Sequence, residues 1–158
     1  MKILVFSDSH SELRYLRAAI LAEKPQQVLH LGDHAADAEL LSREFPLLPF
    51  AVVRGNCDWS AKQPLTRLLT LDGTRYLLCH GHTYHVKDSL LSACYAAREQ
   101  RADVLLFGHT HIPYFEQTDG LILLNPGCCY GRYPSYAQII SAPGQPPKIT
   151  LKSPEVKL

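Results

Sequence analysis

The first 55 residues alternate between short apolar runs and segments with helical spacing, which limits the folds open to the chain more than any other feature. The runs at 2–6, 28–31 and 49–53 have the length and branched side chains of buried strands. Between them, two segments ending at Pro25 and Pro46 place apolar side chains three or four residues apart. This β-α-β-α-β order predicts parallel strands, right-handed crossovers and helices packed on the sheet.

Turn and cap signals refine this prediction. Ser9 and Glu12 have the spacing of a capping box, so the first helix is expected to start there. Residues 65–71 and 75–79 read as a hairpin with Asp72-Gly73 at the turn, and a helix is expected over 88–100. Further strands are expected over 104–107, 114–118, 121–124, 136–141 and 148–151. With no linker or repeat, the sequence predicts a single α/β domain over residues 1–158 that contains more than one sheet.

Composition excludes several classes of protein. The formal charge of +1 argues against nucleic acid as a partner, because non-specific binding relies on an excess of basic residues. No apolar run approaches the roughly 20 residues of a membrane helix, and the first one is too short for a signal peptide. The five cysteines form no C-x-x-C pair, which predicts reduced thiols. We therefore expect a cytoplasmic protein with no membrane segment.

Polar side chains directly follow five of the predicted strands. In α/β sheets, ligands bind beyond the carboxyl ends of the strands, so these groups are expected to meet at one edge. Four of the five segments also contain a glycine, which permits close approach of the backbone. The segments are Asp8-Ser9-His10, Gly32-Asp33-His34, Gly55-Asn56-Cys57-Asp58, His80-Gly81-His82 and Gly108-His109-Thr110-His111.

These segments supply two carboxylates, four imidazoles and one amide as candidate metal ligands. The ligands are Asp8, His10, Asp33, Asn56, His80, His109 and His111. This mixed oxygen and nitrogen set suits manganese, which we expect first, and also zinc, iron, nickel or cobalt. Seven groups exceed the needs of one tetrahedral ion but suit two divalent ions about 3.5–4 Å apart, bridged by a carboxylate and a hydroxide.

Several of these aspartates and histidines could instead have purely structural roles. Asp8 and Asp33 each precede a predicted helix and could serve only as caps, although capping does not explain the imidazoles at the other strand ends. His80 is preferred over His82 as a ligand because it directly ends its strand, which leaves His82 to orient a ligand or a phosphate. His30 lies inside an apolar strand and is expected to be a core residue. The sequence leaves open the roles of His34, His85, Cys128, Cys129 and Arg132.

The ordered motifs D-x-H, G-D, G-N-x-D, H-G-H and G-H-T-H resemble those of the calcineurin-like metallophosphoesterase superfamily. The short chain with Asn125-Pro126-Gly127 near its end is similar to the small single-domain phosphodiesterase branch, and the resemblance covers residues 3 to about 140. It implies a four-layer α-β-β-α sandwich with two mixed sheets and a dinuclear metal centre.

The resemblance also implies a role for each motif residue. Asp8, His10 and His111 would hold one ion and Asn56, His80 and His109 the other, with Asp33 as the bridge. The expected catalytic residues are Asp33, Asn56, Cys57, Asp58 and His82. Many members of the superfamily have histidine where this chain has Cys57. Because a thiol, with a pKa of about 8.5, is a weaker acid catalyst than an imidazolium, we expect diesters to be preferred over alkyl monoesters.

Two functions from different classes follow. The first is a metal-dependent phosphodiesterase that hydrolyses a small phosphodiester by in-line attack of a metal-bridging hydroxide. The second is a non-catalytic metal-binding scaffold for protein assembly, a use made of this fold by a relative of the branch. A residue able to bind a metal ion stands at each of the seven ligand positions, which favours the enzyme. The short loops around the cleft leave open a homo-oligomer, a dimer or tetramer, in which a neighbouring subunit completes the site.

Overall fold

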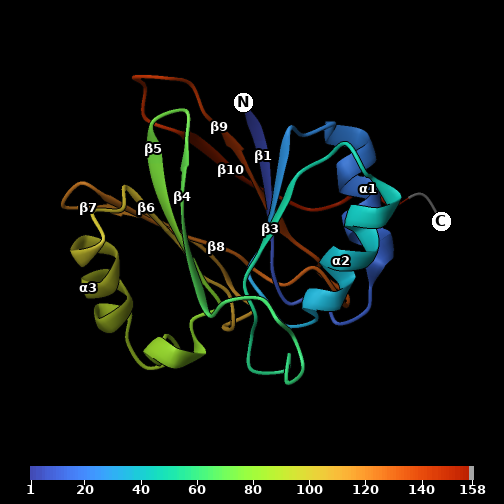
Figure 1. Ribbon diagram of the computed structural model, residues 1–158, viewed down its shortest axis with the longest axis horizontal. Coiled ribbons are helices and arrows are strands. Elements are labelled where there is room, and N and C mark those ends of the chain that lie inside the picture. Colours follow the sequence, from blue (N-terminus) through green and yellow to red (C-terminus); the bar gives the residue numbers. More distant parts are fainter. Residues whose placement is uncertain (157–158) are drawn as a thin grey trace.

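The computed structural model describes residues 1–156, so the last two residues of the predicted domain lie outside the described part. Four layers stack in the order helices, sheet, sheet, helix (Figure 1). Helices α1 (Leu13–Glu23) and α2 (Ala35–Glu44) cover one sheet, and α3 (Leu91–Glu99) covers the other. The predicted four-layer α-β-β-α sandwich with two mixed sheets is confirmed.

The first sheet contains the parallel strands predicted at the start of the chain. Its order is β10-β9-β1-β2-β3, with β1 parallel to β2 and β2 parallel to β3. Strands β9 and β10 run antiparallel and come from the end of the chain. The bounds are β1 Lys2–Phe6, β2 Gln27–His30, β3 Phe50–Val52, β9 Tyr136–Ile140 and β10 Lys148–Lys152.

The second sheet has the order β4-β5-β6-β8-β7, with three parallel strands at its centre and an antiparallel strand at each edge. Asp72 and Gly73 both have positive φ, of 48° and 82°, as the predicted tight hairpin turn requires. The bounds are β4 Thr66–Leu71, β5 Thr74–Cys79, β6 Val104–Leu106, β7 Pro113–Thr118 and β8 Leu121–Pro126.

Strand β1 shows why the central strands read as continuous apolar runs. Ile3 and Val5 pack between the two sheets, whereas Leu4 and Phe6 pack against the layer of α1 and α2. All four side chains are fully buried. A strand covered on both faces needs apolar residues at every position, whereas apolar and polar residues alternate along a half-exposed strand.

Two predicted helix starts are wrong. Helix α1 begins at Leu13 without a side-chain cap, because the Ser9 hydroxyl is used elsewhere and donates to Asp37 Oδ2 at 2.6 Å. Helix α3 begins at Leu91 instead of residue 88. It is preceded by the 3₁₀-helix His82–Tyr84, which His85 caps. His85 has a φ of 52° and its carbonyl accepts the Asp88 N–H, and the resulting turn interrupts helical geometry.

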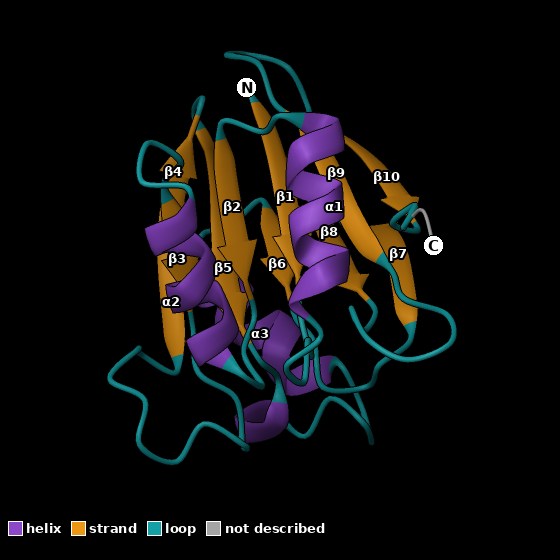
Figure 2. Cartoon of the chain, turned by 90° about the vertical axis from the view of Figure 1, so that its right-hand side faces the viewer, coloured by secondary structure: helices purple, strands orange, loops and turns teal. Residues whose placement is uncertain are grey.

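The loops that follow β1, β2, β3, β5 and β6 gather at one end of the sandwich, at the bottom of Figure 2. The backbone N–H of Gly108, after β6, bonds to the carbonyl of His80, after β5, and Asp8 N–H bonds to the carbonyl of Gly32. The five cysteines are free thiols, as predicted. No helix among residues 1–156 is both long enough and apolar enough to cross a membrane.

Candidate metal centre

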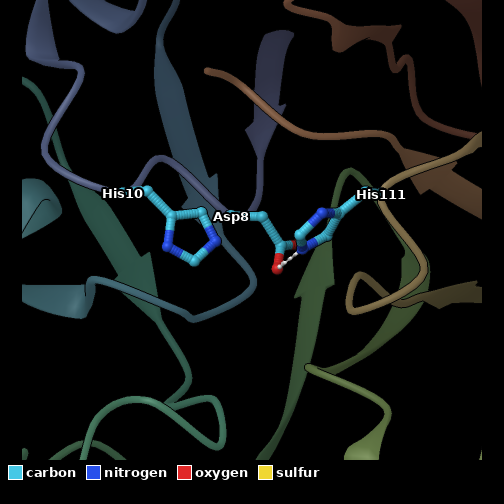
Figure 3. Close-up of side chains that lie close together, drawn as sticks. All are labelled: Asp8, His10 and His111. Carbon is cyan, nitrogen blue, oxygen red and sulfur yellow. Dashed lines mark ion pairs between the residues drawn. The ribbon is translucent and has the colours of Figure 1, made fainter. Parts of the chain in front are cut away.

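The loop end contains two groups of side chains whose donor atoms converge. Asp8, His10 and His111 form one group, shown in Figure 3, and Asp33, His80 and His109 form the other. Within each group, one donor atom from every residue lies within 4.8 Å of the others. Six of the seven predicted ligands therefore fall into two trios, each built from loops of both sheets.

In the first trio, Asp8 divides its two oxygens between different tasks. Its Oδ2 accepts hydrogen bonds from Ser7 Oγ at 2.6 Å and from the His109 N–H at 3.1 Å. Its Oδ1 is buried without a hydrogen-bond partner, 3.0 Å from His111 Nε2 (Figure 3), and His10 Nε2 is likewise buried and unpartnered. Donor atoms that share an ion through bonds of about 2.1 Å lie about 3 Å apart, so this trio fits a cation.

In the second trio, hydrogen bonding leaves one ring nitrogen of His80 free. His80 Nδ1 donates to the carbonyl of Leu31 at 2.9 Å, so Nε2 of the neutral ring carries a lone pair. This nitrogen faces Asn56 Oδ1 at 3.1 Å and Asp33 Oδ2 at 3.4 Å. When the ring is neutral, three acceptor atoms face one another here, and a bound cation satisfies this arrangement. Asn56, the seventh predicted ligand, thus joins the second trio.

Burial and neighbouring charges shift the pKa values of four candidate ligands in the metal-free site. Burial lowers the pKa of His10, and burial together with His80 lowers that of His109 to about 4, so both rings are neutral at neutral pH. Burial acts to lower the pKa of His80, but Asp33 and Asp8 outweigh it and raise that pKa. Burial acts to raise the pKa of Asp33, but His80 and the Cys57 N–H outweigh it, so this carboxyl is ionised.

The ligand loops are held in sparsely populated backbone conformations. Positive φ values occur at five of the seven candidate ligands, which are Asp8, His10, Asp33, His109 and His111. Glycine permits the close contacts between these loops. A Cβ on Gly55 would lie 2.1 Å from Asp33 Oδ1, and one on Gly108 would lie 2.0 Å from Ser7 Oγ. The predicted need for glycine beside the ligands is thus met at both positions.

Asp58 is placed to fix the loops rather than to face the trios. Its Oδ2 accepts the backbone N–H groups of Asp33 at 2.9 Å and Gly55 at 2.7 Å, and its Oδ1 accepts that of Ala35 at 2.9 Å. These bonds join the loop after β2 to the loop after β3. Asp58 therefore positions Asp33, and the capping alternative for Asp33 fails because its own carboxylate binds Cys57 N–H.

His82 and Cys57 lie beside the second trio. The ring of His82 is centred 5.5 Å from that of His80 and 6.2 Å from that of His109. Burial and the neighbouring His80 lower the pKa of His82. The Cys57 side chain is exposed, and its Sγ lies 3.6 Å from Asn56 Nδ2. Both therefore adjoin the second trio without contributing a donor atom to it.

Two aromatic rings adjoin the first trio, although the sequence assigned a role to neither. The ring of His34 is centred 4.9 Å from that of His10, and its Nδ1 lies 3.1 Å from Ser11 Oγ. The ring of Tyr130 is centred 4.6 Å from that of His10, and its hydroxyl lies 3.5 Å from His111 Nδ1. The position of His34 after Gly-Asp was a usable signal, whereas nothing in the spacing around Tyr130 indicated this site.

The remaining residues left open by the sequence lie outside the trios. Cys129 is buried, and its N–H bonds to the carbonyl of Ser7, whereas the Cys128 Sγ points toward the Tyr130 carbonyl at 3.9 Å. Arg132 stacks its guanidinium 5.3 Å above the ring of Tyr133. His85 ends the short 3₁₀-helix. None of these contacts places a further donor atom in either trio.

Two buried polar residues support the ligand loops from behind. His30 is fully buried, as predicted, and its Nδ1 accepts the Gly32 N–H at 3.2 Å while its Nε2 lies 3.0 Å from Ser9 Oγ. Asn125 donates to the Gly108 carbonyl and to Thr110 Oγ1, both at 3.0 Å. The sequence places His30 in an apolar strand and Asn125 in the Asn-Pro-Gly motif but does not reveal these contacts.

A four-layer sandwich with two trios of His and Asp side chains at its loop end is the arrangement expected of a metallophosphoesterase domain. Residues 1–140 match the model of the calcineurin-like phosphoesterase superfamily domain, and the chain belongs to this family. The resemblance seen in the sequence is therefore confirmed.

Named relatives agree with this assignment. The chain is 39% identical to the probable metallophosphoesterase YsnB of Bacillus subtilis over 127 residues, 80% of this chain and 74% of that protein. It is 29% identical to the phosphodiesterase MJ0936 of Methanocaldococcus jannaschii over 150 residues, 83% and 86% of the two chains. The crystal structure of Vps29 from Entamoeba histolytica in complex with zinc has the same fold, with a TM-score of 0.75, 19% identity and coverage of 98% and 100%.

Proposed function

We propose that this chain is a metal-dependent phosphodiesterase that acts as a single domain on small phosphodiesters. The observation that carries the proposal is the pair of adjoining trios, in which acceptor atoms face one another at 3.0 and 3.1 Å. Asp8, His10 and His111 would hold one divalent ion, and Asn56, His80 and His109 the other. Asp33 would bridge the two. The name of the relative MJ0936, a phosphodiesterase, agrees with this class of reaction.

When bound, two divalent ions would lower the pKa of a water molecule to generate a hydroxide and would neutralise charge on the phosphate. The chain's own residues position these reactants. Asp58 fixes the loop of Asp33, and His80 is held by the carbonyl of Leu31. The His82 ring, which lies beside those of His80 and His109, would orient a phosphate oxygen. Most of the acceleration would therefore come from positioning and electrostatics.

The test compares two nitrophenyl substrates on protein stripped of metal and then loaded with Mn²⁺, Zn²⁺ or no ion. The expected result is turnover of bis(p-nitrophenyl) phosphate that requires added metal, is fastest with Mn²⁺ and exceeds turnover of p-nitrophenyl phosphate. Bound metal is counted on the same samples by plasma mass spectrometry. Two ions per chain are expected, because the ligand set is too large for one tetrahedral ion.

The second candidate is the metal-binding scaffold, and its support is a sequence relative of 29% identity over 137 residues, the vacuolar protein sorting-associated protein 29 of Schizosaccharomyces pombe. The scaffold would give a folded chain that binds metal but turns over neither ester with any divalent ion. That outcome would contradict the phosphodiesterase. A preference for the monoester would retain the metal-dependent hydrolase and overturn the diester specificity.

Replacing Cys57 with histidine is expected to improve hydrolysis of esters with poor leaving groups. Burial, followed by the nearby Asp33, raises the pKa of the Cys57 thiol, so it is a weak acid toward a leaving alkoxide. General acid catalysis contributes about 10²–10⁴-fold, so even a poorly aligned imidazole should raise kcat/KM for an alkyl monoester about tenfold. The exposed position leaves room for the larger ring.

Cys57→Ser is the matched control, because it keeps a small side chain without an efficient proton donor. It should leave the ratio of monoester to diester hydrolysis close to that of the unchanged chain. If Cys57→His retains its metal content but gives no gain toward the alkyl ester, the lack of an acid at this position does not limit the substrate range.

A further inference from the structure

A pocket adjoins the candidate metal centre on the side of the loop after β3. Its volume is about 570 Å³, within the range of small-molecule sites. Cys57 and His34 connect the pocket to the trios, because the Cys57 N–H binds Asp33 and the His34 ring packs near His10. A group attached to a phosphate at the trios can therefore extend into this pocket.

Trp59 forms a wall of this pocket and is the single tryptophan of the chain. Its side chain is 92% exposed. It also lines a second, smaller pocket together with Asn56 and His82, so the indole stands at the border of two hollows that both adjoin the site. A large aromatic side chain left in water beside a polar site is available to stack on a planar ligand group.

The base of the Trp59 loop is fixed before any ligand binds. The preceding residue, Asp58, accepts three backbone N–H groups, among them that of Asp33. The Ala61 N–H bonds back to the Asp58 carbonyl at 3.2 Å and closes a turn around Trp59. The backbone that carries the indole is therefore held relative to the candidate bridging carboxylate, which lowers the entropy cost of binding.

The far side of the pocket supplies polar groups. Gln63 donates to Glu39 Oε1 at 2.5 Å, which orients the Glu39 carboxylate among the lining residues. Lys62 also lines the pocket and contributes a positive charge. Carboxylate and amide groups can accept hydrogen bonds from the hydroxyl and amine donors of a nucleoside. A purely apolar ester would offer them no such donors.

We propose that the Trp59 pocket binds the nucleoside portion of a nucleotide diester, with the base stacked on the indole and the phosphate at the trios. This inference rests on the proposed phosphodiesterase function and specifies its substrate class. Glu39 would accept hydrogen bonds from the sugar or the base. Stacking on an aromatic side chain tolerates different bases, so the pocket would select for a planar ring more than for a particular base.

Because Trp59 is the single tryptophan, its fluorescence reports on the pocket without requiring turnover. The chain is titrated with adenosine 5′-monophosphate and, separately, with ribose 5-phosphate, which has the same sugar and phosphate but no base. Quenching that saturates with the first ligand and is absent with the second is expected. Quenching by neither ligand, or equal quenching by both, would overturn the stacking site.

A kinetic comparison provides the second readout on the Mn²⁺-loaded chain. The p-nitrophenyl ester of thymidine 5′-phosphate is compared with methyl p-nitrophenyl phosphate, which shares its leaving group and charge. Removing a stacking aromatic ring costs about 1–3 kcal/mol, so Trp59→Ala should lower kcat/KM for the nucleoside ester about tenfold more than for the methyl ester. Trp59→Phe should recover part of the difference. Tyr95→Ala, which removes another exposed aromatic ring on α3, is the matched control and should affect neither ester.

The outcomes separate the two proposals. Metal-dependent hydrolysis of both esters with equal losses in Trp59→Ala would overturn the nucleoside site and leave the phosphodiesterase standing. Saturable quenching by adenosine 5′-monophosphate without turnover of any diester would overturn the phosphodiesterase and leave a nucleotide-binding site.

Discussion

Replacing Asp33 with alanine is expected to release both metal ions and to abolish phosphodiester hydrolysis. Asp33 is 3% exposed, and its Oδ2 lies 3.4 Å from His80 Nε2 while its Oδ1 accepts the Cys57 N–H at 2.9 Å. Without this carboxylate, the second trio has no anionic member and the proposed bridge is lost. Loss of a group that merely orients a ligand costs about 10–100-fold in affinity or activity, so loss of the bridge should exceed 100-fold.

Metal content after gel filtration and initial rates with the nitrophenyl diester measure this prediction. Asp33→Asn keeps the shape of the side chain and removes its charge, and it should fail in the same way. Asp119→Ala removes a carboxylate whose side chain is 85% exposed, in the turn between β7 and β8, and should retain metal and activity. Two tightly bound ions in Asp33→Ala would contradict the bridging role.

The sequence predicted the layers well because hydrophobic spacing is a local property. β1 has the predicted bounds, and β6 to β10 differ from theirs by one or two residues. Among these strands, β1, β6 and β8 are buried on both faces and are continuous apolar runs. The capping box failed for a non-local reason. Ser9 was expected to bond within its own turn, but its hydroxyl is bound by His30 and Asp37, which lie 21 and 28 residues away.

The candidate site divides in the same way. Its proposed ligands could be predicted because each directly follows a strand, and parallel strands bring their carboxyl ends together. Tyr130 could not be predicted, because it comes from the loop after β8 and reaches His10 only when the sandwich is closed. Trp59 likewise follows the ligand motif without any spacing signal, and only its 92% exposure beside a pocket distinguishes it from a core residue.

Acid is expected to destabilise the folded chain through His30. Its Nδ1 accepts the Gly32 N–H and its Nε2–H faces Ser9 Oγ, which in turn donates to Asp37. A protonated ring would place a second N–H against that of Gly32, so the fold requires the neutral form. Burial lowers the pKa of His30 to about 4, although the Asp37 charge acts to raise it.

Because the pKa of His30 is lower in the folded chain than its ordinary value of about 6.5, the unfolded chain takes up a proton first as the pH falls. The stability that His30 contributes is therefore complete above about pH 6.5 and is lost on the way to about pH 4, up to about 3 kcal/mol. The free energy of unfolding in urea, measured on metal-free chain across this range, should fall about 1.4 kcal/mol per pH unit more steeply than in His30→Gln.

The glutamine variant isolates this effect because its amide can still donate to Ser9 but takes up no proton in this range. Comparing the two chains cancels the contribution of His10 and His109, whose pKa values burial also lowers. His85→Gln removes an exposed imidazole outside the network and should keep the steep slope of the unchanged chain. Equal slopes for the unchanged chain and His30→Gln would mean that the ring binds its proton equally well in the folded and unfolded chain. The fold would then not require the neutral form of this ring, in which Nδ1 accepts the Gly32 N–H.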